Sequence, residues 1–329
     1  MRPFLSLLIM AFLSGSFALP AAAQESLAAH PTTGRQKDTL LKFAANPKAG
    51  FHFDYLVLLP KGLKSEATNY LMVETNNTGL NDTMTYHEKG ARFAATRSGV
   101  AVYVAKKLQI PLLIPIFPRS QTHWMVYTHA LDRDAFLSKG DSIERLDLQL
   151  LAMITDARKQ LGQQGYPLKE KFFMTGFSAS GTFANRMSLL HPEKIQAVAT
   201  GGINAIAILP VAKLEGKTLN YPLGTADIKK VTGKAVNLDA FKALPKLLYM
   251  GALDDNDAAA FDDGYSAEER ALVYGLMGKQ MIPQRWSFME QQYKKAGVQA
   301  EFRTYPGIGH GTDLKILDDL VDYFKAHAE

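Results

Sequence analysis

Short apolar runs alternate with longer segments of helical periodicity through most of the chain. The runs typical of strands are FHFDYLVLLP, NYLMVET, PLLIPIF, KFFMTGF, IQAVATGG, KLLYMGA and AEFRTY. Apolar residues follow helical spacing over residues 86–108, 141–163 and 312–327, and a further helix is expected after KFFMTGF. Asp141 and Glu144 resemble the capping box that opens a helix. Strands that alternate with helices predict an α/β fold with a mostly parallel sheet flanked by helices on both faces.

Three stretches interrupt this alternation. Residues 24–50 are polar and weakly patterned, and we expect an exposed lead-in there. Residues 204–244 lie between two predicted strands, and residues 256–282 follow another. Both stretches exceed the usual length of a connection, which favours cap or lid elements. We therefore expect one domain over residues 51–329 with these two insertions.

The N-terminus has the pattern of a secretory signal peptide. Met1 and Arg2 precede an apolar stretch over residues 4–17, and a run of alanines ends at Ala23. Residues 1–23 are therefore interpreted as a signal peptide, and the mature protein is expected to be secreted or periplasmic. No later stretch reaches the roughly 18 apolar residues of a membrane span, so we expect no membrane anchor.

Composition narrows the class of protein further. The chain has 329 residues, of which 47% are hydrophobic, and it contains no cysteine. A core must therefore stabilise it without disulfides, which suits export into a bacterial periplasm or medium. Its 37 basic and 32 acidic residues are interspersed, and a net charge of +5 is too diffuse to favour a nucleic-acid partner.

His87, His123 and His129 lack the spacing of a metal site, and no motif indicates a cofactor or an oligomeric state.

Two serines compete for a chemical role where KFFMTGF meets the next helix. The stretch MTGFSASG holds Ser178 and Ser180. A nucleophile on a tight strand-to-helix turn needs small residues two positions before and after it. Around Ser178 these residues are Gly176 and Ser180, whereas Ser180 is flanked by Ser178 and Thr182. Sterics therefore favour Ser178, and Ser180 becomes the small residue that lets the turn close.

A serine nucleophile needs a base to take its proton and an acid to orient that base. His310 lies in YPGIGHGT, directly after the last predicted strand, where glycines let the backbone turn. The run KLLYMG continues into GALDDND, which offers Asp254, Asp255 and Asp257 as the acid. The residues alone leave the choice among these three carboxylates open.

The motifs GFSASG, GALDDND and GHG, in this order, resemble those of the α/β-hydrolase superfamily. The part near Ser178 also looks like secreted esterases and polyhydroxyalkanoate-depolymerase-like hydrolases. The resemblance implies an α/β-hydrolase fold with a triad of Ser178, Asp254 and His310, because the usual spacing of the acid after a glycine selects Asp254. The chain departs from the G-x-S-x-G pattern at Ser180, which stands where the last glycine is expected.

The same resemblance implies an oxyanion hole built from two backbone N–H groups. One donor is expected from Ala179, the residue after Ser178. The other is expected from the loop ETNNTG, with Asn77 or Thr78 as the donor.

These residues predict a secreted serine hydrolase that forms an acyl-enzyme on a small-molecule or polymer ester. A peptidase or amidase of the same fold is the alternative, followed by a non-catalytic binding protein. Four aromatic residues of the non-core segments are candidates for a substrate pocket: Trp124, Tyr127, Tyr274 and Trp286. Packing of the insertions onto the sheet would equally explain their apolar character.

Overall fold

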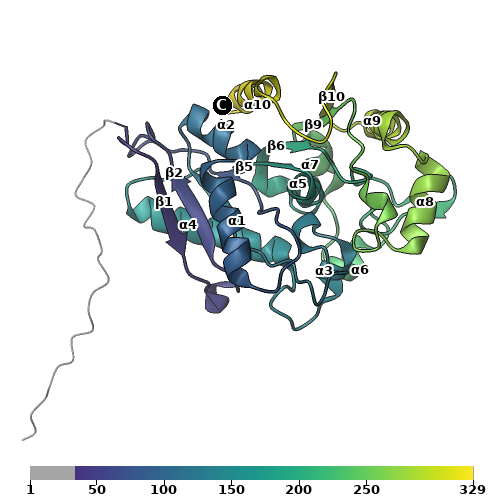
Figure 1. Cartoon of the computed structure of the whole chain (residues 1–329), viewed down its shortest axis with the longest axis horizontal. Coiled ribbons are helices and arrows are strands. Elements are labelled where there is room, and N and C mark those ends of the chain that lie inside the picture. Colours follow the sequence, from purple (N-terminus) through teal and green to yellow (C-terminus); the bar gives the residue numbers. More distant parts are fainter. Residues whose placement is uncertain (1–33, 329) are drawn as a thin grey trace, which may run out of the picture. The chain divides into compact units, whose positions relative to one another are not determined.

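The computed structural model describes residues 34–328, which build an eight-stranded sheet (Figure 1). Its strand order is β1-β2-β4-β3-β5-β6-β9-β10. The strands are β1 (Thr39–Phe43), β2 (Tyr55–Leu59), β3 (Met72–Val73), β4 (Leu112–Pro115), β5 (Phe172–Phe177), β6 (Ile195–Gly201), β9 (Lys246–Gly251) and β10 (Ala300–Tyr305). β2 pairs antiparallel with β1 and β4, and the remaining pairs are parallel. The mostly parallel sheet is confirmed, whereas the predicted signal peptide lies outside the described residues.

Helices cover both faces of this sheet. They are α1 (Met84–Thr96), α2 (Val100–Leu108), α3 (Arg133–Leu137), α4 (Leu146–Gln163), α5 (Ala179–Leu190), α6 (Ile228–Thr232), α7 (Leu238–Ala243), α8 (Ala267–Met277), α9 (Trp286–Lys295) and α10 (Leu314–Ala326). Side chains alternate along a strand. Leu56 and Leu58 of β2 accordingly pack with α1, α2 and α10, while Tyr55 and Val57 pack with α4 and α5. No helix within residues 34–328 is long and apolar enough to cross a membrane.

Two elements near the N-terminal part of the domain differ from expectation. Part of the expected lead-in forms β1, an edge strand whose Leu41 and Phe43 pack against the core. The helix expected over residues 86–108 is divided, because Gly99 adopts an extended conformation (φ −170°, ψ 152°) before α2 begins. A Cβ at Gly99 would lie 2.9 Å from the carboxylate of Glu74, so the break brings the start of α2 close to a buried acid.

The expected capping box of Asp141 and Glu144 does not form. The Glu144 carboxylate instead accepts the backbone N–H of Gly140 at 2.8 Å. α4 begins only after Arg145, which has left-handed backbone angles (φ 54°, ψ 53°). The local turn and Arg145 therefore replace side-chain capping at this helix start.

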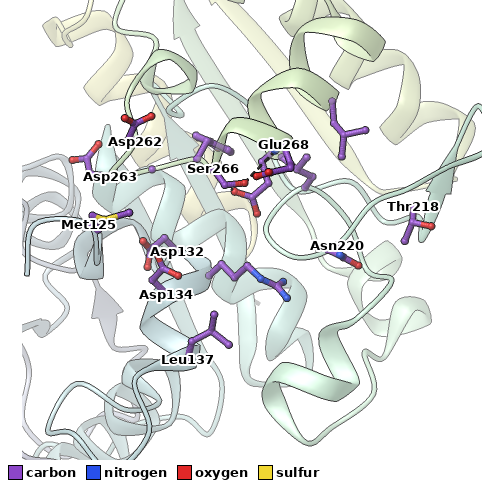
Figure 2. Close-up of a pocket in the computed structure, with 16 residues that line it drawn as sticks. Met125, Asp132, Asp134, Leu137, Thr218, Asn220, Asp262, Asp263, Ser266 and Glu268 are labelled. Carbon is purple, nitrogen blue, oxygen red and sulfur yellow. Dashed lines mark hydrogen bonds between the residues drawn. The ribbon is translucent and has the colours of Figure 1, made fainter.

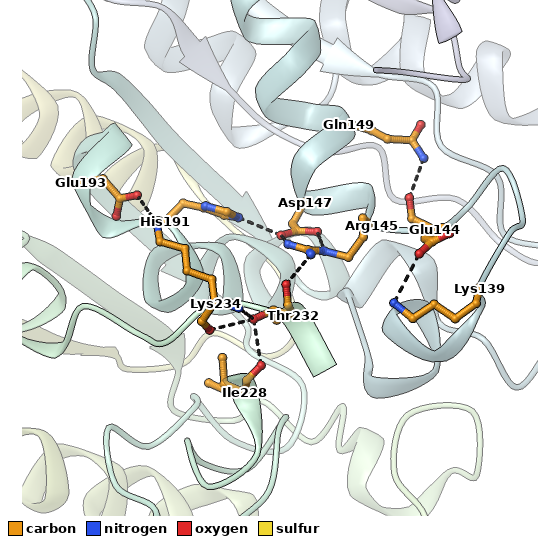
Figure 3. A network of polar contacts seen from close by, with 10 residues as sticks. All are labelled: Lys139, Glu144, Arg145, Asp147, Gln149, His191, Glu193, Ile228, Thr232 and Lys234. Carbon is orange, nitrogen blue, oxygen red and sulfur yellow. Dashed lines mark hydrogen bonds and ion pairs between the residues drawn. The ribbon is translucent and has the colours of Figure 1, made fainter. Parts of the chain in front are cut away.

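Arg145 enters a buried ionic network instead (Figure 3). Its guanidinium donates two hydrogen bonds, of 2.9 and 2.8 Å, to the fully buried carboxylate of Asp147 and a third, of 2.6 Å, to the carbonyl of Thr232. His191 Nε2 lies 2.8 Å from Asp147 Oδ2. The network ties α4 to the end of α5 and to α6.

The two insertions carry secondary structure of their own. Residues 204–244 hold the hairpin β7 (Lys213–Leu214) and β8 (Lys217–Thr218) with α6 and α7, and residues 256–282 hold α8. The start of the first insertion is buried in the main core, since Ile206, Ile208 and Leu209 are at most 2% exposed. The fully buried Arg285 donates to the carbonyl of Ala205 at 3.2 Å and pairs with Asp257, which connects the two insertions.

Candidate active site

Ser178 occupies the sharp turn between β5 and α5. Its backbone angles (φ 61°, ψ −126°) are rare for a residue with a side chain. Two close backbone approaches enforce the turn. A Cβ at Gly176 would lie 2.4 Å from the carbonyl of Ser180, and a Cβ at Gly181 would lie 2.4 Å from the carbonyl oxygen of Gly201. Glycine is therefore required at both positions if Ser178 is to stand at the tip.

Ser180, the rival serine, is 2% exposed and serves the turn itself. Its Oγ accepts the backbone N–H of Phe177 at 2.9 Å and lies 2.9 Å from the carbonyl oxygen of Phe177. It also lies 3.4 Å from Oε1 of Glu74. A glycine at this position has no hydroxyl and could not make these hydrogen bonds.

His310 and Asp254 form a hydrogen-bonded pair at the carboxyl ends of β10 and β9. His310 Nδ1 lies 3.0 and 2.9 Å from the two carboxylate oxygens of Asp254, which is 4% exposed. Asp257 instead pairs with Arg285 and accepts the backbone N–H of Ala259 at 3.0 Å. Of the three candidate carboxylates, Asp254 is the one placed to orient the imidazole.

Backbone packing holds the two loops of this pair together. A Cβ at Gly251 would lie 2.3 Å from the carbonyl oxygen of Ile308 and 2.4 Å from that of Gly309. The backbone N–H of Leu253 donates to the Ile308 carbonyl at 2.8 Å. The glycine at the end of β9 therefore allows the loop of His310 to approach the loop of Asp254.

The imidazole of His310 also lies close to the serine turn. Its ring centroid is 4.8 Å from that of Phe177, the residue before Ser178. His310 Nε2 lies 3.1 Å from Nδ2 of Asn256, and within residues 34–328 no hydrogen bond joins it to Ser178 Oγ. Because Nδ1 faces a carboxylate, Nε2 is left as the proton acceptor, with the Asn256 amide as its present donor.

Hydrogen bonds in the loop after β3 distinguish Asn77 from Thr78 as the second oxyanion donor. The backbone N–H of Thr78 points to Nδ1 of His129, at 3.3 Å, so it is already committed. Asn76 is pinned by its side-chain amide, which donates to the Phe117 carbonyl at 2.8 Å and accepts the Phe117 N–H at 3.0 Å. The N–H of Asn77 makes no hydrogen bond among the described residues, which favours it over Thr78. The N–H of Ala179 lies in the first turn of α5, where helix donors lack an intrahelical partner.

Two buried histidines that were not predicted to belong to the site, His87 and His129, hold this loop. His129 Nε2 lies 3.0 Å from the Phe117 carbonyl oxygen, and Thr78 Oγ1 lies 2.6 Å from Nδ1 of His87. Burial lowers the pKa of His129 to about 3 and also lowers that of His87, so both rings are neutral at neutral pH. Neutral His129 can then accept from Thr78 at Nδ1 and donate from Nε2.

Glu74, directly after β3, is a third residue absent from the sequence-based site. Burial raises the pKa of its carboxyl to about 7. Hydrogen bonds from the Ala101 N–H and Ser180 oppose this increase but are weaker than the effect of burial. The Ala101 bond, 3.2 Å long, comes from the first turn of α2. Glu74 thus connects the start of α2 to the turn that carries Ser178.

A cavity of about 560 Å³ adjoins His310 through Asn256. Trp124 and Tyr127, two of the four aromatic residues predicted for a substrate pocket, line this cavity. Trp286 does not: it is 5% exposed, its indole N–H donates to Thr304 at 2.9 Å, and its ring packs on Phe302. Tyr274 also packs against the core, beneath the guanidinium of Arg285. Neither Trp286 nor Tyr274 lines this cavity, and their assignment to a substrate pocket stays a prediction.

A second cavity, of about 330 Å³, lies between α3, α8 and the first insertion (Figure 2). Its lining includes six acidic residues, which are Asp132, Asp134, Asp262, Asp263, Glu268 and Glu269. Burial raises the pKa of Asp132 to about 7. Two of these carboxylates, Asp262 and Asp263, also line the cavity beside His310. These carboxylates are not placed to share a metal ion, and within residues 34–328 no three His, Asp or Glu side chains are.

Comparison with solved structures identifies the fold. The chain is similar to poly(aspartic acid) hydrolase-1 from Sphingomonas sp. KT-1, with a TM-score of 0.57 and 17% identity over 89% of this chain and 99% of that one. It is also similar to LpqC, a poly(3-hydroxybutyrate) depolymerase from Bordetella parapertussis, with a TM-score of 0.53 and 17% identity over 87% and 95% of the two chains. The sequence matches no family model and no curated protein. The chain has the α/β-hydrolase fold.

Proposed function

We propose that the protein is a serine hydrolase in which Ser178 is the nucleophile, His310 the general base and Asp254 the acid that orients it. The observation that carries this proposal is the pairing of a buried Asp254 with His310 Nδ1, at 2.9 Å, close to a serine held on a strained strand-to-helix turn. A non-catalytic binding protein would need neither the backbone strain nor the oriented imidazole. One of the two similar structures described above is named as a poly(aspartic acid) hydrolase and the other as a poly(3-hydroxybutyrate) depolymerase, which supports the proposal.

The proposed chemistry gives each of these groups one role. His310 Nε2 takes the proton from Ser178 Oγ as that oxygen attacks a substrate carbonyl. The negative charge that develops on the carbonyl oxygen is stabilised by the N–H groups of Ala179 and Asn77. The imidazolium, stabilised by the Asp254 carboxylate, then protonates the leaving group. Water repeats the sequence on the acyl-enzyme and releases Ser178.

Carboxylic esters are the proposed substrates, in small molecules or polymers. An alkoxide is a better leaving group than an amide nitrogen, so ester cleavage makes the smaller demand on His310 as an acid. Amide cleavage stays the second candidate, because one similar structure is named as a hydrolase of poly(aspartic acid). The predicted signal peptide further suggests that the protein works outside the cytoplasm.

A fluorophosphonate probe tests the proposal. The probe should label the wild-type protein and the Ser180→Ala variant, whereas Ser178→Ala should not be labelled. Turnover of a 4-nitrophenyl ester should fall on the order of 10⁴- to 10⁶-fold in Ser178→Ala. Labelling that survives in Ser178→Ala, or a folded wild type that never reacts while a control hydrolase does, would contradict the proposed function.

A further inference from the structure

The cavity beside His310 leaves large aromatic rings uncovered. Trp124 is 45% exposed and Phe261 is 60% exposed, and both line the cavity together with the apolar Ala258. Asn256 lines it too, and its Nδ2 lies 3.1 Å from His310 Nε2, so one side chain connects the cavity to the proposed base. Exposed aromatic surface in a hollow of about 560 Å³ is suited to an apolar or aromatic group.

The charges in this cavity exclude an anionic occupant. Arg119 is the one cation that lines it among the described residues. Its Nη2 lies 2.7 Å from Asp263 Oδ2, and its guanidinium stacks 3.8 Å from the ring centroid of Tyr127. The remaining carboxylate, Asp262, pairs at 2.6 Å with Arg270. Asp263 therefore balances the charge of Arg119, and the adjoining acidic cavity adds repulsion toward a ligand carboxylate (Figure 2).

One buried polar atom in the lining lacks a partner. Asn204 is 3% exposed and lines the cavity together with Tyr127. Its side-chain Oδ1 is a buried acceptor without a hydrogen bond. Nε of Arg119 is likewise buried without a partner. Leaving such atoms unpaired costs free energy that a ligand donor and acceptor can recover.

We propose that this cavity binds an uncharged, apolar or aromatic part of the ester that bears a hydroxyl or amide group, with Asn204 as the specificity-determining acceptor. This inference rests on the proposed function, because the occupant is part of the substrate of Ser178. A hydroxyl or an amide can both donate to Asn204 and accept from a guanidinium, whereas a carboxylate can only accept and brings a charge that the cavity repels.

Matched 4-nitrophenyl arylacetates test the preference. The set is phenylacetate, its three hydroxyphenyl isomers and its three carboxyphenyl isomers. We expect kcat/KM for at least one hydroxyphenyl ester to exceed that of phenylacetate about fivefold. All carboxyphenyl esters should fall at least about tenfold below phenylacetate. Equal rates for carboxyphenyl and phenyl esters, or no hydroxyphenyl isomer above phenyl, would overturn the inference.

Two variants assign the preference to named groups. Asn204→Leu should bring the ratio of hydroxyphenyl to phenyl rates close to one, while Asn220→Leu, at an exposed asparagine of the second cavity, should leave the ratio unchanged. Asp263→Asn releases Arg119 and should raise the ratio of carboxyphenyl to phenyl rates about tenfold. Asp322→Asn, on the exposed side of α10, should not change it. Unchanged ratios in folded Asp263→Asn would overturn the electrostatic argument even if Asn204→Leu failed to fold.

Fluorophosphonate labelling of the same preparations separates the two proposals. Labelling at Ser178 together with indifference to the aryl substituent would overturn this inference and leave the proposed function intact. Absence of both labelling and ester hydrolysis in folded protein would overturn the proposed function and this inference with it.

Discussion

Glu74 and Ser180 meet 3.4 Å apart beneath the turn that carries Ser178. Both side chains are buried, and the Ser180 hydroxyl also lies 2.9 Å from the Phe177 carbonyl oxygen. A protonated Glu74 can donate to Ser180 Oγ and leave the serine proton for Phe177. An ionised Glu74 competes with that carbonyl for the same proton, so the neutral acid completes the network.

This relationship predicts that Glu74→Gln removes a pH-dependent loss of stability. A carboxyl with a pKa of 4.5 when unfolded and about 7 when folded holds its proton longer in the folded state. The folded protein therefore loses stability as pH rises from 4.5 to about 7. Relative to wild type, Glu74→Gln should gain about 3 kcal/mol above pH 7 and nothing near pH 4. Urea unfolding at a series of pH values measures this, and parallel curves for the two proteins would contradict it.

The hydrogen bond from Thr78 to His129 predicts an effect on catalysis without contact to substrate. His129→Leu removes the acceptor and frees the loop that offers the Asn77 N–H, so kcat should fall about tenfold to a hundredfold with little change in KM. His129→Asn keeps an acceptor near the position of Nδ1 and should lose less. Steady-state kinetics on one ester resolve the difference. A rise in KM alone would assign His129 to substrate binding instead.

Glycine 176 provides a steric test of the turn. Gly176→Ala places a Cβ 2.4 Å from the Ser180 carbonyl, which must shift, so we expect a loss of about 2 kcal/mol and of most fluorophosphonate labelling. Gly275→Ala, in α8, meets nothing within 4 Å and should instead gain about 0.5 kcal/mol from helix propensity. Thermal unfolding compares the two. An unperturbed Gly176→Ala would mean that the turn tolerates a side chain there.

The three neighbouring aspartates should differ sharply in their effect on turnover. Asp254→Asn should reduce kcat on the order of 10⁴-fold, because His310 loses the partner that fixes its tautomer. Asp255→Asn, at an exposed position, should remain near wild type. Asp257→Asn should lower stability more than turnover, because it weakens the contact with Arg285. Ester kinetics and unfolding curves on all three variants test this ordering, which a larger kinetic effect at Asp255 or Asp257 would refute.

The ionic network at Asp147 should determine acid stability. Burial by itself raises the pKa of Asp147, but hydrogen bonds and charge from Arg145 and His191 outweigh it and bring the pKa below 3.8. A lowered pKa contributes stability that is present above 3.8 and is lost as pH falls through the folded pKa. Asp147→Asn should cost about 3 kcal/mol at pH 7 and progressively less in acid. The exposed Asp322→Asn should stay within about 0.5 kcal/mol of wild type at every pH.

Local spacing made part of the site predictable. The small residues around Ser178 and the position of His310 after the last strand follow from steric and topological rules that act over a few residues. The alternation of strands and helices likewise predicted the sheet. The break at Gly99 escaped prediction, because apolar periodicity continues across it and Glu74, which approaches Gly99 in the fold, lies 25 residues earlier.

The residues that support the site, His129 and Glu74, could not be predicted from the sequence, because their roles depend on burial. His129 acts through its burial against the β3 loop, and Glu74 through its burial beneath α5, and both environments exist only after distant segments pack. Trp286 shows the reverse case, since its sequence context suited a pocket while Thr304 and Phe302 occupy its ring. Long-range contacts decide which side chains are buried, and this burial cannot be deduced from the neighbouring residues in the sequence.

The histidine of the proposed triad depends on β10, which is one of the two edge strands of the sheet and, within residues 34–328, pairs with β9 alone. Edge elements with half-exposed side chains open locally at a lower free energy than the centre of a domain. Catalytic competence and global folding are therefore separable properties of this protein. On warming, amide hydrogens of β10 should exchange, and turnover should decline, while β5, β6 and the serine turn at the centre of the sheet are still intact.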